Sequence, residues 1–508
     1  MLLADLLDGA ARRHADRPYL MAGERAHTFS EIAQQSDGLA RTLRASGLRR
    51  GDRVACLLET CAEYVVALWA TAKAGGVFVP LSAGISTDRL AFVLCDCEPA
   101  CLVAASAARA RVSLATAQAA SACNVLWVGE TAQGDGLRGL LTAGEGAPVS
   151  ASIDQDLCLI LYTSGSTGEP KGVMLTHHNV RNNAWSIATY LDNQPTDIVL
   201  SALPLSFSYG LFQVITATQA GYAVALERSF TYPFEVLQRA AALRATGFPA
   251  VPAMLSTTLR LAREGKVDLS ALRYVTNAGA ALSPAHLQEL RSILPQARFV
   301  SMYGLTECTR VSYLDPAKAD AKPGSVGHAI PNLEATVVDD AGQEVPRGGV
   351  GELVVRGSGV MRGYWRRPAE TAHVLRDGPT GDKRLFTGDL FRMDEDDDLH
   401  FVGRKDDMFK VKGEKVYPRE IENVLFELDA VREAAVIGLP DPDDGHVIKV
   451  MVVAHEGAEL TAEQIRRHCR ERLERRLMPC LVEVCAALPT TESGKVAKRV
   501  LRASALAE

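Results

Sequence analysis

One short stretch of the chain combines the residue types that bind polyphosphates. Residues 163–172 hold three glycines, four hydroxyl side chains and one lysine, and they follow an apolar run, 157–161, that predicts a buried strand. Glycines let the backbone approach a ligand closely, hydroxyl and backbone N–H groups donate hydrogen bonds, and Lys171 adds a positive charge. Flexible Gly/Ser linkers rarely contain Pro and Lys or follow a buried strand. The stretch therefore predicts a phosphate-binding loop.

The spacing within this loop argues against two common nucleotide-binding motifs. A Walker A loop needs Lys directly after its last Gly, but Gly168 is followed by Glu169 and Pro170. The dinucleotide fingerprint needs Gly-x-Gly, and neither Gly165 nor Gly168 has a glycine two residues before it. Kinase-like and dehydrogenase functions are therefore disfavoured.

Further motifs follow in a fixed order along the chain. They are residues 301–307 (SMYGLTE), 386–390 (FTGDL), 403–413 (GRKDDMFKVKG) and 488–495 (LPTTESGK), with 51–54 (GDRV) and 73–76 (KAGG) near the N-terminus. Together with the loop, this set resembles the adenylate-forming superfamily of acyl-CoA synthetases, adenylation domains and luciferases. The pattern is most similar to that of AMP-forming acyl-CoA ligases. Chance does not produce such a set in this order over nearly the whole chain.

The resemblance implies an α/β fold in two parts. A large N-terminal region, residues 1–403, would contain stacked mixed sheets and helices plus a β-barrel-like subdomain, and would bind ATP and the acid. A small, mobile α+β domain, residues 404–508, would carry the hinge and the catalytic lysine. Composition does not locate this boundary, although a chain of 508 residues is longer than one core usually supports.

The apolar pattern of the chain is also that of an α/β protein, in which strands and helices alternate. Strand-like segments are expected at 53–58, 77–81, 92–104 and 125–128, and helix-like segments at 63–73 and 104–122. In the C-terminal part a basic segment, 496–502, is expected to be helical.

Charge and composition exclude several classes of protein. A formal net charge of −6 gives no sign of nucleic-acid binding. The first residues include Asp5 and Asp8, which disfavours a signal peptide, and the most apolar stretch, 210–226, is too short to span a bilayer. Eleven cysteines without a framework spacing indicate a reducing compartment. We therefore expect a cytoplasmic protein.

Two clusters raise the question of a metal. Cys95, Cys97 and Cys101 lie close together, but no histidine is near, and the first two alternate as on a strand, so a structural role is favoured. The acidic run 394–398 is interpreted as a solvated hairpin turn rather than a cation site.

The resemblance assigns most of the nucleotide site residue by residue. The residue matching Tyr303, which Gly304 follows, stacks on adenine, and Asp389 with Arg404 would bind the ribose. The phosphates would be held by Thr163, Ser164, Gly165, Ser166, Thr167, Gly168 and Lys171, and the base lined by Asn277, Ala278, Gly279, Ala280 and Ala281.

Catalytic roles fall on four residues. Glu307 is a hard oxygen ligand suited to Mg²⁺, and Thr306 can donate to the α-phosphate. The resemblance implies that Lys495 enters the site during adenylation as a cation facing the α-phosphate and the carboxylate. It also implies that the small domain rotates about Asp406, which brings Lys410 to the site for the thioester step.

The acid pocket is less well specified. Phe207, Tyr209 and Phe212 would give a medium-sized aromatic pocket, with Ser208 and Met302 beside it, although aromatic residues here could equally pack the core. Many acyl-CoA synthetases have His where this chain has Phe207. Amino-acid-activating members usually place Asp near the position of Ser208; a hydroxyl cannot pair a buried ammonium, which favours an acid without an α-amino group.

Arg310 is an unusual residue for this pocket, because many relatives have a small or apolar residue there. It is expected to pair with a protein carboxylate, which we prefer, or with an anionic tail of the substrate.

Three functions remain open on the sequence. The first is an ATP- and Mg²⁺-dependent ligase that converts a non-amino acid, aromatic or medium-chain, to an acyl-adenylate and passes it to CoA. The second is a stand-alone adenylation enzyme that loads the phosphopantetheine of a separate carrier protein. The third is a nucleotide-binding regulator without ligase activity, against which the intact set of Glu307, Asp389, Arg404 and Lys495 argues.

Overall fold

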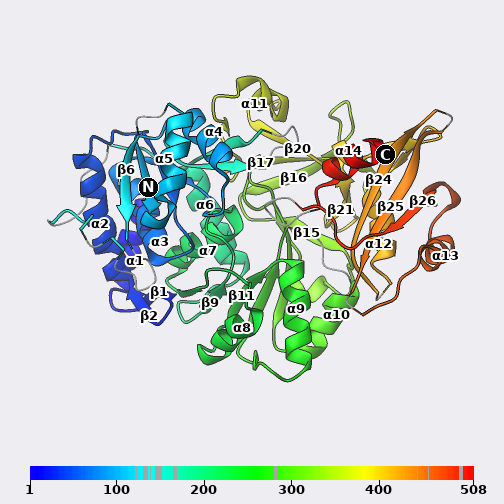
Figure 1. Ribbon diagram of the computed structural model, residues 1–508, viewed down its shortest axis with the longest axis horizontal. Coiled ribbons are helices and arrows are strands. Elements are labelled where there is room, and N and C mark those ends of the chain that lie inside the picture. The colour runs from blue at the N-terminus through cyan, green and yellow to red at the C-terminus, as the bar shows by residue number, and fades with distance from the viewer. Residues whose placement is uncertain are drawn as a thin grey trace.

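In the computed structural model the chain forms two parts, one N-terminal and one C-terminal (Figure 1). The structure describes residues 1–508 except 121–122, 130–135, 138, 144–150, 164–168, 280–283, 429, 443, 456, 491–495 and 508, and the side chains of 284, 285 and 507. The N-terminal elements, in blue and cyan, lie opposite the orange and red C-terminal elements, with the green helices α8 (Pro233–Ala242), α9 (Pro252–Arg263) and α10 (Pro284–Ile293) between and below them.

The phosphate-loop segment belongs to a seven-stranded sheet. Its strand order is β18 (Gly363–Tyr364), β8 (Lys171–Thr176), β7 (Leu157–Thr163), β4 (Val77–Pro80), β3 (Arg53–Leu57), β5 (Cys101–Ala105) and β6 (Asn124–Val128). The pairs from β7 through β4, β3 and β5 to β6 are parallel, and β8 and β18 are added antiparallel. The central strands are short and apolar because both faces of the sheet are covered.

The described residues form a second, longer path of paired strands with two halves. The parallel half contains β1 (Pro18–Ala22), β9 (Ile198–Ser201), β10 (Ala223–Leu226), β11 (Gly247–Ala250), β12 (Tyr274–Asn277) and β13 (Arg298–Tyr303), with β2 (Arg25–Thr28) at its edge. The antiparallel half contains β14 (Ser312–Tyr313), β15 (Ser325–Ala329), β16 (Leu333–Val338), β17 (Val350–Gly357), β19 (Leu375–Asp377), β20 (Lys383–Met393) and β21 (Leu399–Arg404). The short helix α11 (Pro368–Val374) precedes β19, β20 and β21 in the sequence and follows the other strands of this half.

Helices pack between and against these sheets. They are α1 (Ala4–Arg13), α2 (Phe29–Ala45), α3 (Ala62–Ala74), α4 (Thr87–Cys97), α5 (Arg109–Gln118), α6 (His177–Tyr190) and α7 (Ser208–Ala220). Every residue of α3 is buried, as expected for a helix enclosed on all sides. Its Lys73 is paired with Asp8 of α1 at 2.7 Å and Asp37 of α2 at 2.5 Å. Two carboxylates from neighbouring helices thus neutralise a cation whose side chain is 2% exposed.

The C-terminal part has hydrophobic cores of its own. The sheet of β24 (Val431–Asp441), β25 (Gly445–Ala454) and β26 (Leu481–Val484) packs against α12 (Pro418–Leu425), α13 (Ala462–Arg472) and α14 (Lys498–Ala507), beside the hairpin of β22 (Phe409–Val411) and β23 (Glu414–Val416). Its buried clusters contain residues from 409 to 501, whereas those of the large region end at Leu399. The predicted boundary at residue 404 falls between these cores and stays a prediction. No helix within the described ranges is long and apolar enough to cross a membrane.

Most predicted elements are present, and one is wrong. The segment 92–104 is not one strand: its first half belongs to α4, and β5 begins only at Cys101. Cys95 and Cys97 therefore lie on a helix, with Cys95 exposed and Cys97 buried. Burial raises the pKa of the Cys97 thiol to about 12, so this cysteine acts as a small apolar side chain.

The acidic run is the turn between β20 and β21, as predicted. Lys322 places its ammonium 2.7 Å from Asp394, 2.6 Å from Asp396 and 3.4 Å from Asp398. These three carboxylates are the only described group of acidic, His and Cys side chains with spacing suited to a metal. A lysine already supplies the positive charge there.

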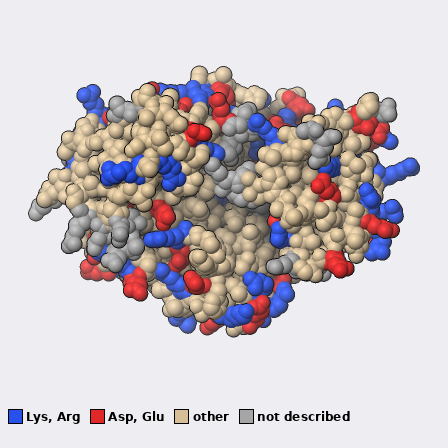
Figure 2. Space-filling view, viewed as in Figure 1, with Lys and Arg blue, Asp and Glu red and all other residues tan. Residues whose placement is uncertain are grey.

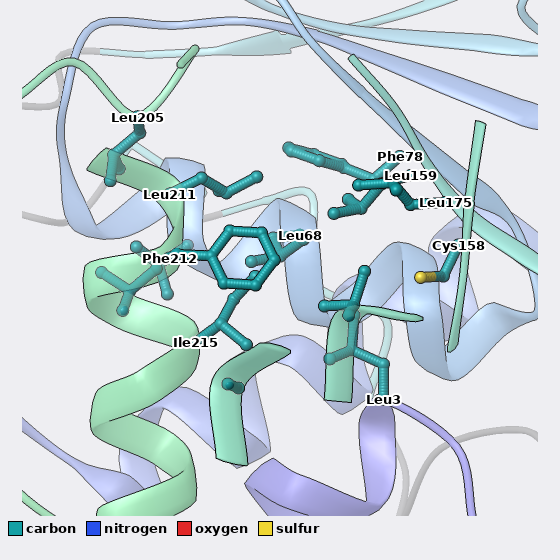
Figure 3. Close-up of a cluster of buried hydrophobic side chains, with 14 of the residues drawn as sticks. Leu3, Leu68, Phe78, Cys158, Leu159, Leu175, Leu205, Leu211, Phe212 and Ile215 are labelled. Atoms are coloured by element: carbon teal, nitrogen blue, oxygen red, sulfur yellow. The ribbon is translucent and has the colours of Figure 1, made fainter. Parts of the chain in front are cut away.

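Phe212 packs in the core instead of facing a pocket. It is 1% exposed and lies beside Leu68, Leu211 and Ile215 (Figure 3). The core alternative, which the sequence left open for this residue, accounts for its position.

We expect Phe212→Ala to destabilise the large region by about 3–5 kcal/mol, because it leaves a cavity in a packed core. The measurement is the urea midpoint of unfolding, with Phe212→Leu as a control that costs less than about 1.5 kcal/mol. An unchanged midpoint combined with an altered acid preference would place Phe212 in the pocket after all.

Candidate active site

The phosphate loop connects two paired strands. Thr163, the last residue of β7, is opposite Lys171, the first of β8, so the two ends of the loop are held side by side. Ser164, Gly165, Ser166, Thr167 and Gly168 lie outside the described residues. The charged group of Lys171 lies 5.4 Å from the centre of the Tyr364 ring.

Tyr364 joins this loop to the predicted metal ligand. Its hydroxyl donates to Oε1 of Glu307 at 2.8 Å, and the backbone N–H of Met361 donates to the Glu307 carbonyl at 2.7 Å. Burial and the Glu307 charge raise the pKa of Tyr364, so it remains a neutral donor. Oε2 of Glu307 accepts no hydrogen bond in the part of the chain that the structure describes. A half-exposed carboxylate with one oxygen held fits a hard cation that keeps several waters.

The predicted ribose-binding pair lies on neighbouring strands. Asp389 of β20 and Arg404 of β21 are cross-strand partners, and their side chains form an ion pair at 2.7 Å. Tyr303 at the end of β13 donates to Oδ2 of Asp389 at 2.5 Å. Burial raises the pKa of the Tyr303 hydroxyl well above its usual range, and the carboxylate adds to the shift. Burial alone would lower the pKa of Arg404, but the charge of Asp389, together with smaller contributions from Tyr303, Asp406 and Glu307, raises it overall.

The base segment begins where two parallel strands end. Asn277, the last residue of β12, is in register with Ser301 of β13, two positions before Tyr303. The carboxyl ends of parallel strands are the usual place for a ligand in α/β sheets. Ala278 and Gly279 continue from there, with Gly279 at a φ of 91°. Ala280 and Ala281 are not among the described residues.

A tight turn after β13 sets the positions of several site residues. The N–H of Val311 donates to the carbonyl of Tyr303 at 2.9 Å, which closes residues 304–310 into a loop that contains Thr306 and Glu307. A Cβ on Gly304 would lie 2.5 Å from the carbonyl oxygen of Thr309, so the backbone can return only because residue 304 is glycine. Thr309 itself has a φ of 62°, a strained value for a β-branched residue.

The start of α7 meets this turn at the expected acid pocket. Phe207 and Ser208 are partly buried at the helix start, and the Tyr209 hydroxyl lies 2.7 Å from Oγ1 of Thr276 on β12. The guanidinium carbon of Arg310 lies 4.5 Å from the centre of the Tyr209 ring. On β13, the sulfur of Met302 accepts from the Tyr190 hydroxyl at 3.0 Å. The structure therefore brings Tyr209 and Arg310 together and places Met302 against Tyr190, whereas Phe212 packs in the core.

The preferred partner for Arg310 is not found. No carboxylate among the described residues lies within 4.0 Å of its guanidinium, so the expected protein ion pair is wrong within that part of the chain. Its Nη1 donates to the Thr309 carbonyl at 3.0 Å, and the Tyr209 ring covers one face.

The remaining C-terminal residues either form no hydrogen bond or ion pair with Glu307 or Asp389 in the described part of the chain, or lie outside it. Asp406 is in a short 3₁₀ turn, Lys405–Asp407, whose carbonyls at 406 and 407 accept from Arg502 of α14 at 3.4 and 3.1 Å. Lys410 is exposed on β22 and forms no hydrogen bond or ion pair with Glu307 or Asp389 within the described ranges. Lys495 is not described.

Sequence reasoning missed Tyr364, Tyr190 and Thr276. Tyr364 lies in the two-residue strand β18, and Tyr190 ends α6. No local motif marks them, since their roles arise from long-range packing.

On the face drawn in Figure 2, basic and acidic side chains are intermixed around a central hollow.

Comparison with known proteins identifies the family. The model of the AMP-binding enzyme family matches residues 7–365, and that of the AMP-binding enzyme C-terminal domain matches residues 420–495. The chain belongs to the AMP-binding enzyme family. A feruloyl-CoA synthase from Amycolatopsis is 36% identical to it over 94% of each chain.

Solved members of this family have the same fold. ATP-bound MatB from Rhodopseudomonas palustris has a TM-score of 0.88 at 30% identity and covers 99% of each chain. The anthranilate CoA ligase AuaEII, in complex with anthranoyl-AMP, has a TM-score of 0.90 at 25% identity and covers 100% of this chain and 98% of its own. These matches confirm the predicted superfamily, the α/β fold class and an AMP-forming acid–thiol ligase.

We expect Gly304→Ala to weaken ATP binding by about tenfold, because the new Cβ would displace the turn that holds Tyr303 and Glu307. Isothermal titration with MgATP measures this. Gly84→Ala is the matched control, since its nearest neighbour would be 3.9 Å away. Equal affinities for the two variants would show that the close approach at Gly304 is not needed.

Proposed function

We propose that this chain is an acyl-CoA synthetase for an aromatic carboxylic acid without an α-amino group. The observation that carries the proposal is the single turn, 304–310, which joins Tyr303 and Glu307 of the predicted nucleotide site to Arg310, whose guanidinium lies against the Tyr209 ring. The ATP-bound MatB and the anthranoyl-AMP complex of AuaEII support the nucleotide and adenylate parts.

In the first step a carboxylate oxygen of the acid attacks the α-phosphorus of ATP, and pyrophosphate leaves with the electron pair of the broken P–O bond. Lys171 and the loop 163–168 would hold the β- and γ-phosphates. Thr306 would donate to the α-phosphate, while Tyr303, Asp389 and Arg404 would fix the nucleoside. Glu307 would hold Mg²⁺, which supplies charge neutralisation between the phosphates.

In the second step the thiol of CoA attacks the acyl carbon and AMP leaves. The small domain would rotate about Asp406 so that Lys495 is replaced at the site by the face that carries Lys410. We propose CoA as the acceptor because the feruloyl-CoA synthase matches this chain along 94% of its length. A separate carrier protein remains the alternative acceptor.

Two features favour a non-amino, aromatic acid. Ser208 offers no negative charge, and the charged side chain against Tyr209 is the cation Arg310, which would repel a substrate ammonium. The feruloyl-CoA synthase and the anthranoyl-AMP complex both involve aromatic acids.

A panel of acids tests the proposal directly. Aryl, fatty, dicarboxylic and amino acids are each incubated with MgATP and hydroxylamine, and pyrophosphate release is measured. We expect the strongest signal from aryl acids and a thioester product when CoA is added. Signal chiefly from amino acids would contradict the argument from Ser208, and no signal with any acid would favour the nucleotide-binding regulator.

Lys495→Ala should lower adenylate formation by at least about a hundredfold, the scale of losing one electrostatic donor to the transition state. Pyrophosphate exchange measures the change, and Lys266→Ala, an exposed lysine paired with Glu264, is the control. Near-normal exchange in the Lys495 variant would remove it from the mechanism.

Asp406→Pro should spare adenylation and stop thioester formation, because proline fixes φ at the proposed hinge. The two half-reactions are assayed separately, and Asp406→Ala, which leaves φ free, should support both. Equal loss of both half-reactions in the proline variant would argue against a hinge at this residue.

A further inference from the structure

Arg310 is a buried cation with no counter-ion among the residues that the structure describes. The residue is 4% exposed, and no carboxylate of a described residue lies within 4.0 Å of its guanidinium. Its Nε–H is buried and has no acceptor in the described part of the chain. Removing a guanidinium from water without a paired charge costs several kcal/mol, so buried arginines are normally paired.

The neighbours of Arg310 compensate for only part of this cost. The Tyr209 ring, at 4.5 Å, offers a cation–π contact, and the Thr309 carbonyl accepts from Nη1. Tyr190 is close enough for Arg310 to oppose the rise in its pKa, which burial takes to about 12. These groups are neutral, so among the described residues the Nε–H has no acceptor and the positive charge has no counter-charge.

The backbone holds Arg310 in this environment. The N–H of Arg310 donates to the Cys308 carbonyl at 2.7 Å, the preceding Thr309 has a φ of 62°, and the Gly304 backbone is packed against both residues. A flexible arginine would turn its charge to solvent. Backbone strain of this kind is found most often at active sites and ligand-binding turns.

A purely structural role explains less. An arginine that only supported the Tyr209 ring would use just the flat face of its guanidinium. A neutral side chain could pack there without the free-energy cost of burying a charge. The orphaned Nε–H would then have no purpose. It is instead a buried donor whose acceptor is not among the described residues of the chain.

We propose that Arg310 determines substrate specificity by binding a second anionic oxygen group on the acid, remote from the carboxylate that is activated. This inference rests on the proposed adenylation and names its substrate class as aromatic acids with a second carboxylate. Tyr209 would lie against the ring of the substrate and Arg310 would pair with its far end.

Matched acids test the assignment. The kcat/KM of pyrophosphate release is measured for 4-carboxycinnamate, cinnamate and 4-hydroxycinnamate, and for the shorter pair terephthalate and benzoate. We expect the wild-type protein to prefer the diacid of at least one pair by tenfold or more. In Arg310→Met the diacid should lose about a hundredfold, the scale of an uncompensated buried charge, while its neutral partner changes by less than about threefold.

Two further variants keep the result interpretable. Arg310→Lys should retain part of the diacid preference, whereas Arg298→Met, which removes an arginine that donates to the Leu191 carbonyl, should leave it intact. If Arg310→Met fails to fold, two other measurements test the inference. They are the diacid preference of Arg310→Lys and the rise in Tm of the wild-type protein with ATP and each acid, which should be larger with the diacid than with its neutral partner.

The outcomes separate the two proposals. Equal loss for diacid and neutral acid would make Arg310 a structural residue or a ligand of the activated carboxylate, and would overturn the inference. A preference for 4-hydroxycinnamate over both others would replace the second carboxylate with a phenol and overturn it as well. Adenylation of neutral acids alone overturns the inference but keeps the synthetase, and adenylation of no acid overturns both.

Discussion

The close backbone approach at Gly304 is the constraint on which the rest of the site depends. Because residue 304 has no Cβ, the chain can turn back within a few residues and return the Val311 N–H to the Tyr303 carbonyl. The turn holds Tyr303, Glu307 and Arg310, for which we propose contacts with the nucleoside, the metal and the acid. Three groups proposed to act on different parts of two substrates thus share one backbone support.

The surrounding sheets hold this turn from three directions. Parallel strands β12 and β13 bring Asn277 and Tyr303 to the same edge, and antiparallel β20 and β21 bring Asp389 and Arg404 into register against Tyr303. The third support is β18, where Tyr364 holds Glu307. The arrangement requires strands from both halves of the long sheet path.

Gly304 and Glu307 could be named from the sequence because they lie in one contiguous motif, 301–307, that resembles a motif of a known family. The structure shows that this motif forms a turn, and the roles of its residues stay predictions. Tyr364 and the core position of Phe212 were beyond reach, since both depend on which elements pack together. The strand expected over 92–104 is wrong for another reason. The apolar end of α4 is followed closely by the strand β5, and the alternation of Cys95 and Cys97 does not show the helical period.

Two buried cations in this chain make opposite use of their surroundings. Lys73 lies between two helices far from the nucleotide residues, and carboxylates from both helices are within 2.7 Å of it. The fold therefore supplies counter-charges where a cation serves packing. Arg310 is buried to a similar extent within the turn that positions Glu307, yet its described neighbours include only neutral acceptors and an aromatic ring. The proposed role of Arg310 accounts for the difference, because a protein carboxylate beside it would occupy the position that an anionic substrate group needs.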